Sequence, residues 1–146
     1  MTQQAYQRDA NFVPITSLGL LQSKAITYVA GTTGAIGTTT LFTVTGTVAM
    51  NVWAICSVDL TGTGSMSVGV AGSTAALCTA QTASSITAHK VWQGANLAIA
   101  TNVGTNQYIT DQSVIQTIGT STATAGTLTY YCTWVPISAD GAVVAA

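Results

Sequence analysis

The sequence predicts an all-β protein, an antiparallel β-sandwich of the jelly-roll type with an extended N-terminal arm. Three observations lead to this prediction. Apolar and β-branched residues alternate in short runs, Gly, Ser, Thr and Asn separate the runs, and helical periodicity is almost absent. About eight such runs, with turn residues roughly every ten positions, are typical of two packed antiparallel sheets.

The length and hydropathy of the chain bound its class. At 146 residues it matches one domain, which buries about two thirds of the surface of the unfolded chain and needs no disulfide framework. Although 48% of the residues are hydrophobic, no run approaches the ~20 apolar residues of a membrane span. Pro14, Thr16 and Ser17 interrupt the early apolar stretch. We therefore expect no signal peptide, and synthesis and folding in a cytosol.

The clearest predicted strand is 48–60, VAMNVWAICSVDL. Its residues divide between two faces with a period of two. The face predicted to enter the core carries Val48, Met50, Val52, Ala54, Cys56, Val58 and Leu60, and the opposite, semi-polar face carries Asn51, Trp53, Ile55, Ser57 and Asp59. The turn residues TGTG at 61–64 then predict a hairpin into the run at 65–72.

Further strands are predicted from the same alternation. They cover 25–30, 39–45, 86–92, 107–110, 112–118 and 127–135, whereas 93–106 reads as a loop or a poorly marked strand. In the last strand the core face carries Leu128, Tyr130, Cys132 and Trp134, and Tyr131 lies among threonines on the other face. The predicted organisation is an arm at 1–24, a sandwich at 25–137 and a small-residue tail at 138–146.

The scarcity of charge excludes some partners and suggests others. Arg8, Lys24 and Lys90 are the three basic residues, too few for the ~6–10 phosphate contacts of a typical nucleic-acid site. Charged residues make up 5% of the chain, whereas the surface of a soluble domain usually carries about 25–35%. We infer that partners cover much of the surface. The alternative is a free-standing domain that threonine hydroxyls keep in solution.

The sequence offers little for catalysis or metal binding. Cys56, Cys78 and Cys132 include no closely spaced pair, so neither a zinc site nor a redox motif is expected. Cys56 and Cys132 fall on inward faces, where buried free thiols are expected and a disulfide between them is the alternative. His89 is expected on the surface. Without glutamate and without a G-x-S-x-G turn, we expect no enzymatic activity, no cofactor and no bound metal.

Two aromatic residues on the semi-polar faces are candidate interface residues. Trp53 and Tyr131 could press against another subunit or stack on a sugar ring. The subunit contact is the favoured interpretation, because aromatic residues with few charges around them are typical of assembly interfaces.

The N-terminal stretch YQRDANFVPI, residues 6–15, resembles a known family. It is similar to the opening R-D-x-N-F-V-P of small virion proteins of tailed bacteriophages, and the likeness continues through 40–77 and 130–146. The resemblance implies a structural capsid decoration, or cement, protein. Such a protein would lie on the exterior of the virion, assemble in the host cytoplasm, and bind the major capsid protein and other copies of itself as a homotrimer.

This resemblance gives the arm a predicted role. An extended segment can add hydrogen bonds to the strand edge of a partner while its side chains fill pockets or pair with charges. The residues assigned to capsid binding are Arg8, Asp9, Asn11, Phe12, Val13 and Pro14. Alternatively, the arm is a tether, or the protein is a tail-fibre or baseplate module that binds host carbohydrate through Trp53, Tyr131 or residues 102–108.

Overall fold

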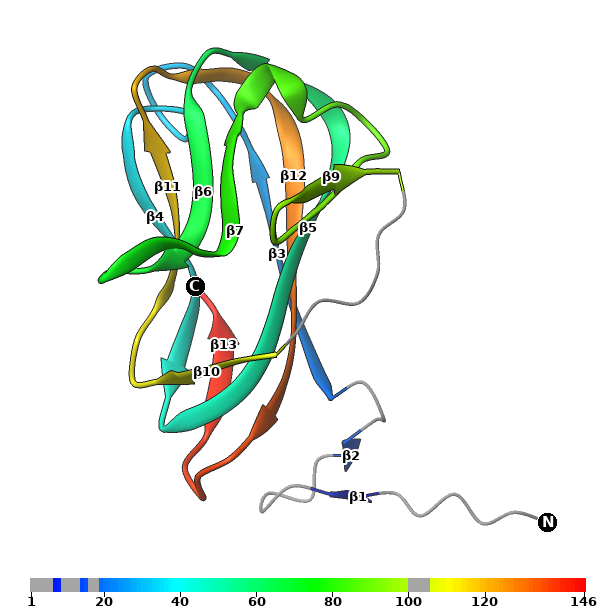
Figure 1. The fold of residues 1–146 in the computed structure, drawn as a ribbon, viewed down its shortest axis with the longest axis vertical. Helices are drawn as coiled ribbons and strands as arrows, with labels where there is room; N and C mark the ends of the chain where they lie inside the picture. The colour runs from blue at the N-terminus through cyan, green and yellow to red at the C-terminus, as the bar shows by residue number, and fades with distance from the viewer. Residues whose placement is uncertain (1–6, 9–13, 16–18, 100–105) are drawn as a thin grey trace, which may run out of the picture.

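A computed structural model describes residues 7–8, 14–15, 19–99 and 106–146. Two antiparallel sheets pack face to face (Figure 1), which confirms the predicted all-β sandwich. The six-stranded sheet has the order β3 (Leu20–Thr27), β12 (Ala123–Pro136), β5 (Thr47–Gly62), β8 (Val91–Gln93) and β9 (Asn96–Ala98), and β10 (Gln107–Thr110) pairs with another part of β5.

The five-stranded sheet closes the other side of the core. Its order is β13 (Ala142–Ala145), β4 (Gly37–Thr45), β11 (Val114–Gly119), β6 (Ser65–Val70) and β7 (Ser73–Thr82). The short 3-10 helix η1 (Ala83–Ser85) follows β7, and β1 (Gln7–Arg8) and β2 (Pro14–Ile15) form a separate two-stranded sheet.

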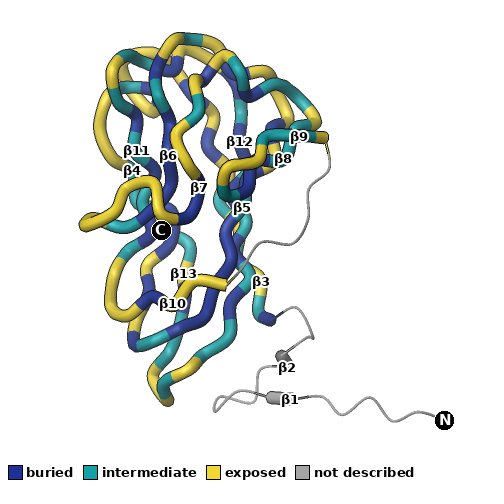
Figure 2. The backbone as a smooth tube through the Cα atoms, in the orientation of Figure 1, coloured by how far each residue is buried: buried dark blue, intermediate teal, exposed yellow. Residues whose placement is uncertain are grey.

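The ladder between β5 and β12 is the longest in the fold. Its register places Ala54 opposite Tyr130 and Val52 opposite Cys132. The inward residues of both strands are buried, as the tube in Figure 2 shows. The predicted core faces of the two strands are therefore confirmed, with one exception on β5.

That exception is Val58, which was expected in the core and is 56% exposed. Leu128 pairs with Cys56 whereas Thr127 pairs with Val58, so Ser57 is an extra residue on β5. Such a bulge breaks the alternation of faces and turns Val58 outward. Leu60 then returns to the core.

The predicted hairpin through residues 61–64 is wrong, because β5 and β6 belong to different sheets. β12 occupies one edge of β5, and β8 and β10 share the other, so β6 pairs with β11 instead. Gly62, at φ 104°, lies where a Cβ atom would collide with the Thr122 carbonyl. The observed hairpin joins β6 to β7, whose ends pair as Val70 with Ser73.

Both predicted ends of the sandwich need correction. β3 begins at Leu20, so residues 20–24, which were assigned to the arm, pair with β12 as part of the sheet. The predicted tail contains β13, an edge strand on β4 that buries Val143. Small apolar residues gave this strand a weak signal, although an Ala/Val strand can pack against an existing edge.

Two other elements differ from their predictions. The stretch 73–82 forms β7, which was not predicted. β9 lies within 93–106, which was predicted as a loop or a poorly marked strand, and the strand alternative is confirmed for Asn96–Ala98. Within the expected strand 86–92, only Val91 and Trp92 belong to a strand, because His89 adopts a turn with φ 67°.

A buried polar network links the two sheets inside the apolar core. The Tyr28 hydroxyl, just beyond β3, lies 2.6 Å from Gln116 Oε1 on β11 and 2.8 Å from the Tyr130 hydroxyl on β12. Tyr130 also donates to Gln116 Oε1 at 3.0 Å. Burial raises the pKa of both tyrosines well above the usual value, so both hydroxyls stay protonated and hydrogen-bonded.

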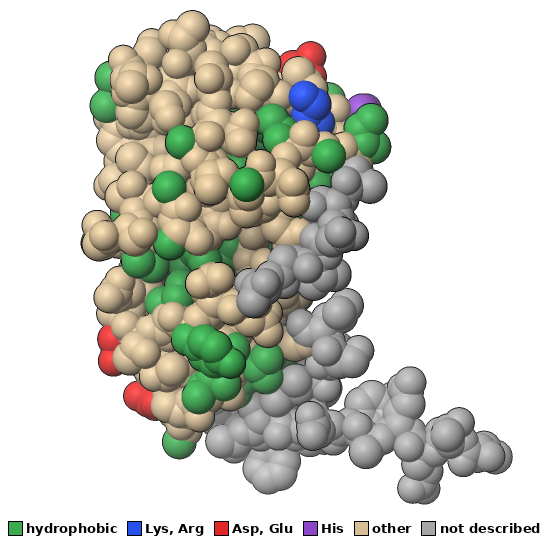
Figure 3. Space-filling view, in the orientation of Figure 1, with side chains coloured by type: hydrophobic (Ala, Val, Ile, Leu, Met, Phe, Trp, Pro, Cys, Tyr) green, Lys and Arg blue, Asp and Glu red, His purple; other side chains and the backbone are tan. Residues whose placement is uncertain are grey.

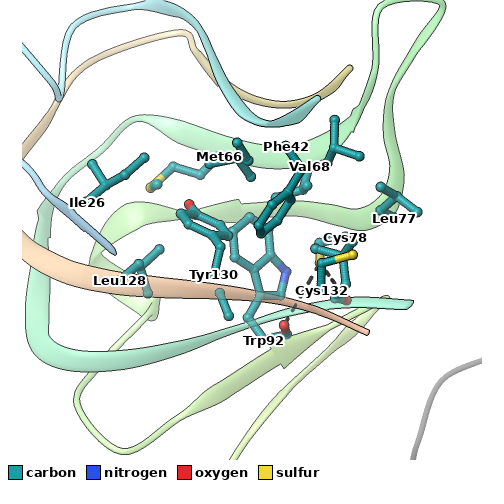
Figure 4. Packing of buried hydrophobic residues seen from close by; sticks show 14 of the residues in the cluster. Ile26, Phe42, Met66, Val68, Leu77, Cys78, Trp92, Leu128, Tyr130 and Cys132 are labelled. Atoms are coloured by element: carbon teal, nitrogen blue, oxygen red, sulfur yellow. Dashed lines mark hydrogen bonds between the residues drawn. The ribbon is translucent and has the colours of Figure 1, made fainter. Parts of the chain in front are cut away.

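Apolar residues from both sheets surround this network. Figure 4 shows Phe42, Met66 and Val68 of the five-stranded sheet around the Trp92 and Tyr130 rings of the other sheet. Trp92, Phe42 and Tyr130 are fully buried. The core therefore joins the two sheets into one packed unit.

Replacing a core isoleucine should destabilise the protein far more than replacing an exposed one. Ile118 is 3% exposed and Ile36 is 60% exposed. We expect Ile118→Ala to lower the free energy of unfolding by about 2–5 kcal/mol, and Ile36→Ala to change it by less than about 0.5 kcal/mol. Urea denaturation of both variants checks this, and equal costs would contradict the assigned core.

Candidate interaction surfaces

The outward side of the six-stranded sheet presents the two predicted interface aromatics together. Trp53 on β5 and Tyr131 on β12 are register partners. Their ring centroids are 5.8 Å apart and their planes differ by 15°, so the rings stack. Both side chains are half-buried. Cross-strand pairing thus brings together two residues that the sequence separates by 78 positions (131 − 53).

Other outward residues extend this surface on both sides of the stack. The register places Ile55 beside Thr129, and Leu21 beside Thr133. We define the aromatic face as Leu21, Ser23, Ala25, Ala49, Asn51, Trp53, Ile55, Tyr108, Thr129, Tyr131 and Thr133, of which Ala49 and Asn51 are buried. Leu21 and Tyr108 are well exposed. From the sequence, Leu21 had no assigned role and Tyr108 belonged only to the alternative carbohydrate-binding range 102–108. Only the register shows that both share a face with Trp53.

A buried amide pair lies close to the aromatic stack. The Gln93 amide nitrogen donates to Asn51 Oδ1 at 3.1 Å. Both side chains are buried. The amide of one side chain thus compensates for the lost hydration of the other, since a buried polar group needs a hydrogen-bond partner.

The outward side of the five-stranded sheet has a different character. We define the hydroxyl face as Thr38, Thr40, Thr43, Thr45, Ser65, Ser67, Ile115, Thr117 and Val144. Thr43 and Thr45 on β4 are exposed. The exposed hydroxyl groups hydrogen-bond well to water, whereas Ser67 is buried and the Thr117 hydroxyl is buried without a hydrogen-bond partner.

The carboxylates of Asp59, Asp111 and Asp140 accept hydrogen bonds from backbone or hydroxyl groups that lie in turns. None of the three belongs to the aromatic face or the hydroxyl face. Asp59 accepts a hydrogen bond from the Ala88 amide at 2.6 Å, and Asp111 accepts one from the Gly46 amide at 2.7 Å. A hydrogen bond from Ser138 lowers the pKa of Asp140. These three acids therefore stabilise connections between strands.

The two lysines of the described part of the chain also bind backbone groups. Lys24 Nζ donates to the Thr40 carbonyl at 2.8 Å, which links the edge strand β3 to β4 of the other sheet. Lys90 Nζ donates to the Ser85 carbonyl at 2.9 Å. Charged groups lie near the margins of the view in Figure 3. No charged residue belongs to the aromatic face or the hydroxyl face as defined above.

The three cysteines are buried and free. The prediction of buried thiols at Cys56 and Cys132 is confirmed, and the alternative of a disulfide between them is wrong. Desolvation raises the pKa of Cys78 and of Cys132 to about 12. Thiols in this state are poor nucleophiles, because the thiolate is the reactive form.

The remaining titratable groups do not converge on one site. His89 is exposed, which confirms its predicted place on the surface. Within 19–99 and 106–146, no three His, Cys, Asp or Glu side chains come together as a possible metal site.

The arm residues are only partly described. β1 and β2 pair with each other, with Gln7 opposite Ile15 and Arg8 opposite Pro14. The first and last residues of the motif are thus neighbours across this small sheet, which pairs with no strand of the sandwich. Asp9, Asn11, Phe12 and Val13 lie outside the described residues. The capsid-binding role of the arm stays a prediction.

Comparisons with known proteins find little similarity. No protein-family model matches the sequence, and no curated protein matches it. A chain of the solved "Cyanophage Pam1 capsid asymmetric unit" aligns with 20% identity and a TM-score of 0.46, over 91% of this chain and 96% of that chain. We infer nothing about function from a likeness at this level. Among the described residues, no helix has the length and apolar character to cross a membrane.

The buried thiols predict that alkaline pH destabilises the fold. In the unfolded chain a thiol loses its proton near pH 8.5, whereas folded Cys78 and Cys132 keep theirs to about pH 12. The contribution of these thiols to the free energy of unfolding is complete below the pKa of the unfolded chain. It is lost as the pH rises toward the pKa of the folded protein. Each thiol should then cost about 1.4 kcal/mol per pH unit.

Urea denaturation at about pH 8 and about pH 9.5 measures this loss. The buried tyrosines act in the same direction but nearer pH 10. The double variant Cys78→Ala, Cys132→Ala should therefore show a shallower pH dependence than the unaltered chain. An unchanged dependence in that variant would argue against the thiols as its cause.

Proposed function

We propose that this protein is a structural decoration protein on the exterior of a bacteriophage capsid, where its N-terminal arm clamps neighbouring major capsid subunits. The proposal includes assembly as a homotrimer. It involves no enzymatic activity, cofactor or nucleic acid. It rests on the sequence resemblance of the arm and the strand segments, and on the surface of the sandwich.

The observation that carries the proposal is the position of the charged side chains and their hydrogen-bond partners. Each described Asp and Lys side chain has a hydrogen-bond partner in a turn or at a strand edge. The two broad faces are left uncharged, and one of them carries a stacked Trp–Tyr pair. A surface of this kind suits burial against other subunits better than free solution.

The strand order supports the prediction from the sequence that the sandwich is a jelly roll. β3-β12-β5-β8 faces β4-β11-β6-β7. Successive strands alternate between the sheets from β3 to β6, and β7 then leads back to β8. Two interlocked four-stranded Greek keys have this order.

Carbohydrate binding is a second candidate, which the aromatic stack favours. The Trp53 and Tyr131 rings are nearly parallel and half-exposed, so a sugar ring could stack beside them. On that interpretation the protein would belong to a tail fibre or baseplate, and it would be present in few copies.

Removing the arm should separate binding from folding. We expect deletion of residues 1–15 to abolish binding to particles that lack the protein, with an unchanged thermal unfolding midpoint, because the sandwich begins at Leu20. Co-sedimentation with such particles measures the binding. Retained binding by the deletion variant would refute the role of the arm.

A point variant sharpens this test. Phe12→Ala should weaken binding by about tenfold or more if the side chain fills a pocket. Val29→Ala serves as the control, because Val29 is an exposed apolar residue on the sandwich. If both variants bind the particles equally well, the Phe12 side chain does not fill a pocket on the partner.

A further inference from the structure

We propose that the aromatic face is the surface through which two or more copies of this chain associate, with the Trp53–Tyr131 stacks near the centre of the contact. This inference deepens the proposed function by naming the surface of self-contact. The same association can be tested without any capsid.

The two outer faces of the sandwich differ in how well their side chains can hydrogen-bond to water. On the hydroxyl face, threonine and serine side chains dominate, and the exposed ones, such as Thr43 and Thr45, can hydrogen-bond to solvent. The aromatic face holds Trp53, Tyr131, Ile55 and Leu21 on neighbouring strands. Tryptophan and tyrosine are the residues most enriched among the strong contacts of protein interfaces. The free energy gained by removing apolar side chains from water is therefore larger for the aromatic face than for the hydroxyl face.

The aromatic face also suits close contact over several strands. Small side chains flank the stack on the β3 side, with Ser23 next to Tyr131 in the register and Ala25 next to Thr129. A bulge lies at Ser57, beyond this set of residues. The register of β3, β12 and β5 is regular here, and the outward residues from Leu21 to Ala25 and at Trp53 and Ile55 are exposed or half-buried. Ala49 and Asn51, further along β5, are buried.

The absence of charge favours a second copy as the partner. A charged partner group buried here would lose its hydration and meet no counter-charge on the aromatic face. The same face of another copy brings no charge, so the contact has neither repulsion nor an unpaired ion. In the proposed homotrimer, the aromatic faces of three copies would meet around the symmetry axis, which removes their Trp–Tyr stacks from water together.

Sedimentation velocity of the purified full chain, with no capsid protein present, tests this inference. We expect the unaltered chain to be oligomeric at roughly 100 μM, and Ile55→Lys to raise the dissociation constant by about thirtyfold or more. The matched control is Val144→Lys, an exposed β-branched residue of the hydroxyl face that should leave the assembly intact.

A second pair of variants guards against misfolding. Thr129→Lys lies on the aromatic face and Thr43→Lys on the hydroxyl face, and both positions are on strands. Urea denaturation confirms that each variant folds. If the unaltered chain is monomeric, the inference is overturned and the aromatic face would bind a different protein. Equal association of the variants on the two faces would also overturn the inference. A monomeric chain would also remove the homotrimer from the proposed function. Particle binding by the arm can succeed in either case, so the decoration role and the self-contact are tested separately.

Discussion

The pairing of β5 with β12 is the interaction on which the rest of the structure depends. It joins two long strands at the centre of the six-stranded sheet. Because the side chains of a strand alternate, the same ladder aims Val52 and Cys132 into the core and Trp53 and Tyr131 outward. The core and the candidate interface are therefore two sides of one register. A slip of one residue would exchange them.

The small number of charges is the second constraint on this molecule. Asp59, Asp111 and Lys90 hold backbone groups in connections, and Lys24 links the edge strand β3 to β4 of the other sheet. Charges that act in this way stabilise the ends and one edge of the sandwich. They leave the broad faces uncharged, and a contact there with another uncharged surface requires no desolvation of ions.

The alternation of residues predicted much of the fold, because burial on one face of a strand leaves a period-two pattern. It identified the core faces of β5 and β12 and placed Trp53 and Tyr131 on their outward sides. It missed Val58, because a bulge arises from the pairing of two strands and not from one strand alone. The hairpin after β5 was wrong for a related reason: turn residues show that the chain reverses, but not which sheet it enters.

The candidate surface could be predicted only in part. Trp53 and Tyr131 stood out as aromatic residues among polar neighbours, but their stacking depends on a register between segments far apart in the sequence. Leu21 carried no signal of its own, and Tyr108 was considered only within the alternative carbohydrate-binding range 102–108. β13 was read as a tail, because alanine and valine in a short run do not distinguish an edge strand from a linker.

The copy number of this protein in purified particles, relative to the major capsid protein, is the most direct measure of its proposed role. Quantitative mass spectrometry of intact virions provides it. A structural decoration role predicts a ratio near one, or near a simple fraction set by the capsid lattice. A few copies per particle would contradict it, and would favour a tail or fibre module that binds through Trp53 and Tyr131.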